Sequence, residues 1–105
     1  MTASSVDASS VVAGFRALAD PLRLQILETL RESELCVCDL CDRLNVNQSK
    51  LSFHLKTLRE AGLVRARQEG RWMYYSLDLT QLVALEQYLS DYRRFATLQS
   101  APRCC

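Results

Sequence analysis

Apolar residues recur every three or four positions through most of the chain, which is the spacing of one face of a helix. This pattern predicts a first helix over residues 11–19. A second helix begins after Asp20, which can act as its N-cap, with Pro21 at the first helical position. A third, short helix is predicted over residues 37–44. The first half of the chain is therefore expected to be helical throughout.

The fourth predicted helix completes a helix-turn-helix. Residues 45–47 form a turn, Asn47 can cap the helix that follows, and Gly62 lies where that helix ends. A helix, a short turn and a second helix are the layout of this motif. The expected buried stripe of the fourth helix consists of Leu51, Leu55 and Leu58.

The hydrophobic period changes after the fourth helix. Residues 63–68 and 71–77 are rich in strand-forming side chains and flank a turn at Gly70, which predicts a β-hairpin. A last helix is expected over residues 79–98. Its apolar face would carry Leu82, Leu85, Leu89, Tyr92 and Ala96. The predicted fold class is mainly α with a small β-hairpin, a winged helix-turn-helix in the order α-α-α-α-β-β-α.

The length of 105 residues fits one domain. We expect a disordered N-terminus over residues 1–10, a DNA-binding and dimerisation domain over 11–98, and a C-terminal tail over 99–105. A monomer of this size buries little surface, so the two amphipathic terminal helices are expected to pair with a second copy in a homodimer. The alternative is that they only close the core of the monomer.

Charge is distributed unevenly although the whole chain carries only +1. Between Arg43 and Met73 there are seven basic and two acidic side chains, hence a net charge of +5, so the remaining residues carry −4. Such a zone suits an anionic partner such as nucleic acid, although a solvated charged surface would have the same composition. The basic residues are Arg43, Lys50, Lys56, Arg59, Arg65, Arg67 and Arg71.

The compartment is expected to be cytoplasmic. The N-terminal residues have no basic segment followed by an apolar one, and no apolar run is long enough to cross a membrane. Thiols stay reduced in the cytoplasm, so the five cysteines are interpreted as metal-binding or redox groups rather than as disulfides.

Four segments resemble the ArsR/SmtB family of bacterial metal-responsive repressors, over roughly Val11 to Leu98. They read LADPLRLQIL, ELCVCDLC, NQSKLSFHLKTLREAGLV and RQEGRWMYYSL, and the second is similar to the arsenic-sensing branch. The resemblance implies a homodimeric repressor whose affinity for double-stranded operator DNA falls when a metal binds. Because a two-fold dimer presents two equivalent helices, the operator is expected to be an inverted repeat.

The second helix of the motif is the candidate recognition helix, and the hairpin is the wing. Glutamine and serine can bond base edges, lysine suits phosphate, and a phenylalanine ring can contact a thymine methyl group or pack beneath the helix. The single histidine is a candidate phosphate contact, or a structural hydrogen-bonding group. The predicted DNA contacts are Gln48, Ser49, Lys50, Ser52, Phe53, His54 and Lys56 on the helix, and Arg67 and Arg71 on the wing.

Cys36, Cys38 and Cys41 place three thiols within six residues. Side chains of an α-helix turn by about 100° per residue, so Cys36 and Cys38 would point in nearly opposite directions. Binding of one atom by all three thiols would then open the first turn of the third helix, and it would compete with a regular DNA-binding motif. Three soft thiolates suit arsenic(III) or antimony(III), whereas zinc prefers four ligands. Thiols near a helix N-terminus are also expected to have a lowered pKa.

Two further interpretations of the cysteines stay open. The trio could belong to the core, although Val37, Leu40 and Leu44 already form the expected apolar stripe. Cys104 and Cys105 are candidate accessory ligands on the tail, with a minor role expected. The sequence predicts arsenic(III) or antimony(III) as the effector and no organic cofactor.

The predicted function is transcriptional repression of an arsenic-resistance operon, relieved when these thiols capture the effector, with no membrane partner. The alternative is a thiol redox sensor, or a cadmium, lead or zinc sensor, of the same fold. An enzyme is not expected, because the C-x-x-C at Cys38 to Cys41 lacks the βαβ surroundings of a thiol oxidoreductase.

Overall fold

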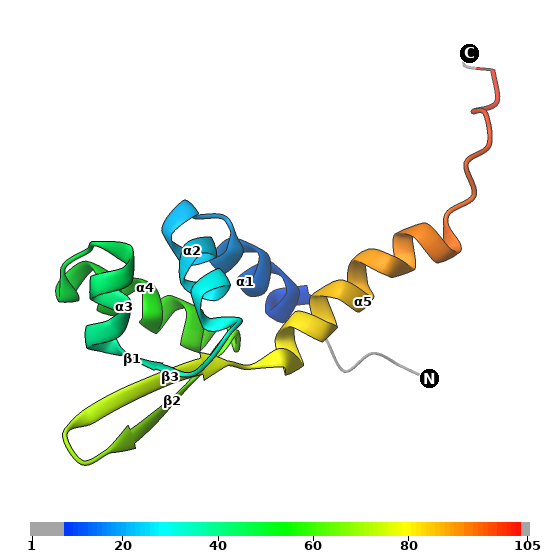
Figure 1. Ribbon diagram of the computed structural model, residues 1–105. Coiled ribbons are helices and arrows are strands. Elements are labelled where there is room, and N and C mark those ends of the chain that lie inside the picture. Colours follow the sequence, from blue (N-terminus) through cyan, green and yellow to red (C-terminus); the bar gives the residue numbers. More distant parts are fainter. Residues whose placement is uncertain (1–7, 104–105) are drawn as a thin grey trace.

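The computed structural model describes residues 8–103 (Figure 1). Its order confirms the predicted fold class, and it contains one additional short strand before the third helix. The elements are α1 (Ala8–Leu18), α2 (Pro21–Leu30), β1 (Leu35–Cys36), α3 (Val37–Leu44), α4 (Gln48–Glu60), β2 (Val64–Glu69), β3 (Trp72–Leu77) and α5 (Leu79–Phe95). No helix within the described residues is long and apolar enough to span a membrane.

The predicted caps define the starts of α2 and α4. An Asp20 carboxylate oxygen accepts hydrogen bonds from the backbone N–H groups of Leu22 and Arg23, at 2.9 and 3.1 Å. The bond from the Arg23 N–H is the main cause of the lowered pKa of Asp20. The Asn47 side chain accepts from the Lys50 N–H at 2.8 Å. Asn45 ends α3 in the left-handed region, at φ 55°, which asparagine tolerates better than most residues.

A three-stranded antiparallel sheet contains the hairpin in the order β1-β3-β2. The hairpin turns at Gly70, whose φ of 64° favours glycine. Strand β1 is only two residues long, and it pairs Leu35 with Tyr75 and Cys36 with Tyr74. The sequence analysis did not predict β1, because two residues carry no alternation and the partner strand lies far along the chain.

The core lies between α1, α2, α3, α4 and the base of the sheet. The predicted stripe of α4 is confirmed, since Leu51, Leu55 and Leu58 are fully buried. The other buried apolar residues are Val11, Ala17, Ile26, Leu27, Leu30, Leu35, Leu40, Leu63, Val64 and Leu85. This core fixes α4 with its opposite face towards solvent.

The first helix begins three residues earlier than predicted. Residues 8–10 were assigned to a disordered N-terminus, but α1 starts at Ala8, and the Gln81 side-chain amide donates to the Ser10 carbonyl at 2.9 Å. This bond attaches the start of α1 to α5. Residues 1–7 and 104–105 lie outside the described residues, and so do the predicted accessory thiols Cys104 and Cys105.

The last helix ends at Phe95 rather than at residue 98, and Ala96 follows in an extended conformation. The alternative that its apolar face only closes the core of the monomer is wrong beyond the first turns, because Leu85 is buried whereas Leu89 and Tyr92 are exposed. Figure 1 shows why: the first half of α5 lies against α1, as far as the contact of Tyr88 with Phe15, and the rest projects away from the other helices.

Candidate nucleic-acid interface and thiol site

The solvent face of α4 presents most of the predicted DNA contacts. Each of these side chains lies opposite the leucine stripe that anchors the helix, so none is needed for packing. Amide, hydroxyl and ammonium groups on one exposed helix face are the groups that bind base edges and phosphates. The exposed residues are Gln48, Ser49, Lys50, Ser52 and Lys56.

Phe53 belongs to the same exposed face. Its residue surface is 63% exposed, which excludes the alternative that the ring packs beneath the helix. The ring meets the His54 ring edge-on, with 5.3 Å between the centroids. An exposed aromatic ring beside hydroxyl and amide groups can contact the methyl group of a thymine.

His54 is the one predicted contact of α4 that the structure removes from this face. It is buried, at 8% exposure, and its Nδ1 lies 3.0 Å from Arg23 Nη1. Because a guanidinium nitrogen is always a donor, Nδ1 must accept, and the proton of the neutral ring is assigned to Nε2. The prediction that His54 contacts DNA is therefore corrected: the side chain joins α4 to α2.

The two arginines of the wing differ in their surroundings. Arg71 is exposed at the turn and has no ion pair to any carboxylate of residues 8–103. Arg67 donates to both carboxylate oxygens of Glu34, at 2.8 and 3.1 Å, and to Glu69 at 2.8 Å. Its guanidinium also lies 4.8 Å from the centre of the Tyr74 ring.

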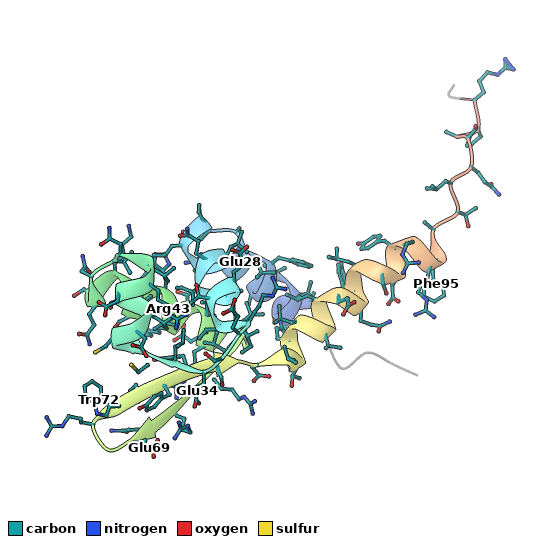
Figure 2. The ribbon with its side chains drawn as sticks, in the orientation of Figure 1. Glu28, Glu34, Arg43, Glu69, Trp72 and Phe95 are labelled. Carbon is teal, nitrogen blue, oxygen red and sulfur yellow. The ribbon has the colours of Figure 1, made fainter. Side chains whose placement is uncertain are left out.

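These ion pairs shift the pKa values of Arg67 and Glu34. The bond to Glu34, followed by the bond to Glu69, raises the pKa of Arg67, and Arg67 in turn lowers the pKa of Glu34. In this structure the predicted DNA contact Arg67 is thus neutralised by carboxylates of its own chain, whereas Arg71 is available for phosphate. Figure 2 shows Glu69 and Trp72 on the hairpin, away from the helices.

Sequence reasoning missed three residues around this surface. Trp72 is 49% exposed next to Arg71, although the aromatic alternation of the strand left open which rings are core. Arg23 and Glu34 carry no local signal, because their partners lie 31 and 33 residues away. Only a covarying pair of positions in related sequences would have indicated them.

The three clustered thiols occupy three different environments. Cys36 ends β1 and serves as the extended N-cap of α3, at φ −80° and ψ 164°. Cys38 is exposed on the first turn of α3, and Cys41 is half-buried against the core. Helical geometry therefore does not set the direction of Cys36 relative to Cys38, because Cys36 precedes the helix. Its position is set by pairing with Tyr74 instead.

The electrostatics of this segment also differ from expectation. Burial raises the pKa of Cys41, and the neighbouring Cys38 and Asp42 raise it further. A lowered pKa was predicted from the helix N-terminus, but Cys41 lies more than one turn along α3 and packs against the apolar core. At least one of the three clustered thiols, that of Cys41, therefore packs against the core.

The three clustered thiols do not form an assembled metal-binding site in this structure. Within residues 8–103, no three Cys, His, Asp or Glu side chains lie close enough together to hold a metal ion. Cys38 and Cys41 are one helical turn apart, which makes them neighbours on the helix surface. A ligand that needs all three thiolates would require Cys36 to move relative to them.

An exposed apolar strip runs along the projecting helix. It begins near α1 and continues to the end of α5, where Figure 2 shows Phe95 far from the hairpin. Single exposed apolar residues are ordinary on a protein surface, but a row of them along one helix indicates a surface that packs against something. The strip consists of Tyr88, Leu89 and Tyr92, which continue the face of Leu85, while Leu79 and Val83 are exposed on the other side of α5. Val12 of α1 and Phe95 at the end of α5 are also exposed.

Comparisons with known proteins agree with this architecture. The family model described as "Bacterial regulatory protein, arsR family" matches residues 20–66, from the N-cap of α2 into β2. The "Arsenical resistance operon repressor" of Escherichia coli strain K12 is 52% identical over 65 residues, which cover 61% of this chain and 56% of that protein. A "Cadmium resistance transcriptional regulatory protein CadC homolog" of Staphylococcus aureus is 42% identical over 65 residues, covering 61% and 54%.

The chain therefore spans little more than half the length of these two relatives. A solved structure covers more. The homodimeric winged helix-turn-helix DNA-binding domain of a possible ArsR-family transcriptional regulator from Mycobacterium bovis has a TM-score of 0.67 and 32% identity. That match covers 89% of both chains.

Proposed function

Because the chain belongs to the ArsR family of DNA-binding bacterial transcriptional regulators, we propose that it represses an arsenic-resistance operon. The proposed repressor binds an inverted-repeat operator as a homodimer. It leaves the DNA when arsenite or antimonite is captured by Cys36, Cys38 and Cys41.

The observation that carries this proposal is the continuity of the thiol segment with both DNA-binding elements. Cys36 lies in β1, which is hydrogen-bonded to strand β3 of the wing. Cys38 and Cys41 lie in α3, and only three residues separate α3 from the recognition helix α4. A change that gathers these thiols must therefore strain the pairing of β1 or the first turn of α3.

The donor set fits a three-coordinate soft ion. Three thiolates within six residues can form a pyramidal site with arsenic(III) or antimony(III), while a tetrahedral zinc site would need a fourth ligand. Because the trio is not gathered, an effector that needs all three thiolates has a higher affinity for a rearranged segment. Such a difference in affinity between two conformations is what shifts a population.

Dimerisation is supported by the apolar strip on α5 and the neighbouring residue Val12. The strip leaves large apolar side chains in water in the single chain, and burying them against a second copy would remove that cost. A two-fold dimer places its recognition helices in successive major grooves, about 34 Å apart, and this geometry requires an inverted repeat.

A second effector class is favoured by one observation. Cys38 and Cys41 are neighbours without any rearrangement, so a dithiol chemistry that excludes Cys36 is available to them. This would suit a redox sensor, or a cadmium, lead or zinc sensor, and one relative is named for cadmium resistance. The two classes differ in whether Cys36 is required.

The test is fluorescence anisotropy of a labelled upstream inverted repeat with the reduced protein, titrated with arsenite. We expect release at about one arsenite per subunit, with a loss of affinity of about 5- to 150-fold. Each of Cys36→Ser, Cys38→Ser and Cys41→Ser should abolish release, whereas Cys105→Ser, at a candidate accessory ligand with a minor expected role, should leave release largely intact. Continued release by the trio variants would show that the assigned site is wrong. Release by cadmium or peroxide, but not arsenite, would favour the dithiol alternative.

A further inference from the structure

A buried hydrogen bond connects α2 to the centre of the recognition helix. His54 is the only buried polar or charged side chain among residues 8–103, and its Nδ1 lies 3.0 Å from Arg23 Nη1. Neither residue belongs to the thiol segment or to the exposed face of α4. A buried polar group that lacks a partner is costly, so this bond restricts where α4 can lie.

The same guanidinium also bonds to the end of α1. Arg23 Nε donates to the Ala17 carbonyl at 2.8 Å, and Nη2 donates to the Arg16 carbonyl at 3.3 Å. The last carbonyl groups of a helix have no partner within it, so a side chain that binds them holds that helix end. All three nitrogens of Arg23 are therefore engaged, two with α1 and one with α4.

The N-cap of α2 holds this arginine in place. The Asp20 carboxylate accepts the backbone N–H of Arg23 at 3.1 Å, and it lies 4.0 Å from His54 Nδ1. The backbone and the guanidinium of one residue thus connect three helices. We call Arg23 and His54 the helix bracket.

The helix bracket connects the two ends of the molecule that differ in function. Helix α1 packs against α5, and a Cβ atom on Gly14 would lie 2.9 Å from side-chain carbons of Leu85, which shows how closely these helices approach. The exposed apolar strip lies on α5, and Val12 of α1 is exposed as well, whereas the DNA face lies on α4. The bracket is the polar link between the proposed dimer side and the DNA side.

We propose that the helix bracket sets the angle between α1 and α4, and thereby the half-site spacing that the dimer accepts. The two helices share the apolar core through α2, and Arg23 adds directed hydrogen bonds to both, which fix their relative angle. Lysine has a single nitrogen, which cannot reproduce three bonds directed at two helices, so Arg23→Lys is not conservative here. The proposal rests on dimeric DNA binding and does not depend on capture by the thiols.

The test measures binding of the effector-free, reduced protein to a panel of inverted repeats. The half-sites stay fixed and the central spacer varies by one base pair at a time, with a single half-site as the reference. We expect the wild type to prefer one spacing. Arg23→Lys should reduce that preference about tenfold, since one charged hydrogen bond carries an effect of that size. Its affinity for the single half-site should stay within about twofold, because the DNA face of α4 is unchanged.

Two variants of His54 keep the test decisive if Arg23→Lys folds poorly. His54→Phe retains a ring and removes the acceptor, so it should lose the spacing preference. His54→Asn retains an acceptor oxygen near the place of Nδ1 and should keep part of it. Arg31→Lys, on the exposed end of α2, is the matched control and should behave as the wild type.

Other results would overturn the proposal. An equal loss of affinity for every spacing and for the single half-site would make Arg23 a general structural residue. An unchanged preference in both Arg23→Lys and His54→Phe would show that the bracket sets no spacing. A wild type that binds no inverted repeat would contradict the proposed function and the bracket together. Failure of arsenite to release DNA has no bearing on these measurements, because they contain no effector.

Discussion

Helix α4 and the segment from Leu35 to Leu44 lie next to each other, but only α4 already has the arrangement of side chains that its proposed role requires. The recognition helix has a side-chain N-cap, three fully buried leucines and an exposed face of polar side chains. The thiol segment divides its three cysteines between a strand end, an exposed turn and a half-buried position. The proposed DNA surface is thus preformed, whereas the proposed effector site would have to be assembled.

This difference gives the proposed repressor its two states. A preformed α4 binds DNA without reorganising. Gathering the thiols requires the neighbouring β1 or α3 to change, so the free energy of capture is divided between binding and rearrangement. Couplings of about 1–3 kcal/mol between two sites are typical, and they suffice to change the occupancy of an operator. A site that was already assembled could bind the effector equally well on and off the DNA, and it would shift nothing.

The largest effect is expected from a substitution in the core face of α4. Leu55→Ala removes a fully buried side chain at the centre of α4, and it should lower the free energy of unfolding by about 2–5 kcal/mol and abolish DNA binding. Urea unfolding followed by circular dichroism measures the first effect. Phe53→Ala, on the exposed face of the same helix, should change stability by less than about 0.5 kcal/mol. Equal destabilisation by the two variants would contradict a preformed, anchored helix.

The next largest effect is expected from a change in the thiol segment. Cys38→Ser alters an exposed side chain, so stability should change by less than about 0.5 kcal/mol. The ratio of operator Kd values with and without arsenite should nevertheless fall from about 5–150 to 1. Anisotropy titrations with and without arsenite give this ratio. A variant that loses both stability and effector-free DNA affinity would show that the thiol segment is part of the preformed structure.

A smaller effect on stability is expected at Asn47, which lies between the thiol segment and α4. Asn47→Ala removes the cap of α4 and should cost about 1 kcal/mol of stability, because the Lys50 N–H loses its acceptor. Thermal unfolding measures this loss. Asn45→Gly is the matched control two residues earlier, since its φ of 55° suits glycine, and it should not destabilise the protein. Loss of stability in the glycine variant alone would contradict the geometry of this turn.

The smallest effect is a dependence on pH at the wing. Arg67 lowers the pKa of Glu34 below its ordinary value of 4.5 in the folded chain. The stability from this pair is therefore present above pH 4.5 and disappears as the pH falls through the lowered pKa. The difference in unfolding free energy between wild type and Glu34→Gln should follow that course. It should also shrink with added salt, because the pair is exposed. A difference that persists in acid would mean that the carboxylate charge is not its cause.

The sequence predicted those features that depend on local patterns. The leucine stripe of α4, the caps at Asp20 and Asn47 and the turn at Gly70 each depend on residues within a few positions. The exposed DNA face of α4 followed from the same periodicity, with the exception of His54. Because these interactions join residues that are close in the sequence, they can be predicted from a single sequence.

The features that sequence reasoning missed depend on distant partners. Helical geometry was applied to Cys36 and Cys38, because the pairing of Cys36 with Tyr74 in β3 cannot be seen from the local sequence. His54 was left open between a phosphate contact and a structural hydrogen-bonding group, because its partner Arg23 lies 31 residues earlier. The apolar face of α5 was expected to pair with a second copy, and the structure leaves Leu89 and Tyr92 of that face exposed in the single chain.

Hydrogen exchange of the free, reduced protein with and without arsenite tests the central claim most directly. The account predicts that arsenite changes exchange in β1 and the first turn of α3, while the amides of α4 between Leu51 and Leu58 keep their protection. The same experiment on a protein with all three clustered cysteines replaced by serine should show no change. Altered protection throughout α4, or no change in β1 and α3 at saturating arsenite, would contradict a preformed DNA surface controlled by a site that assembles on capture.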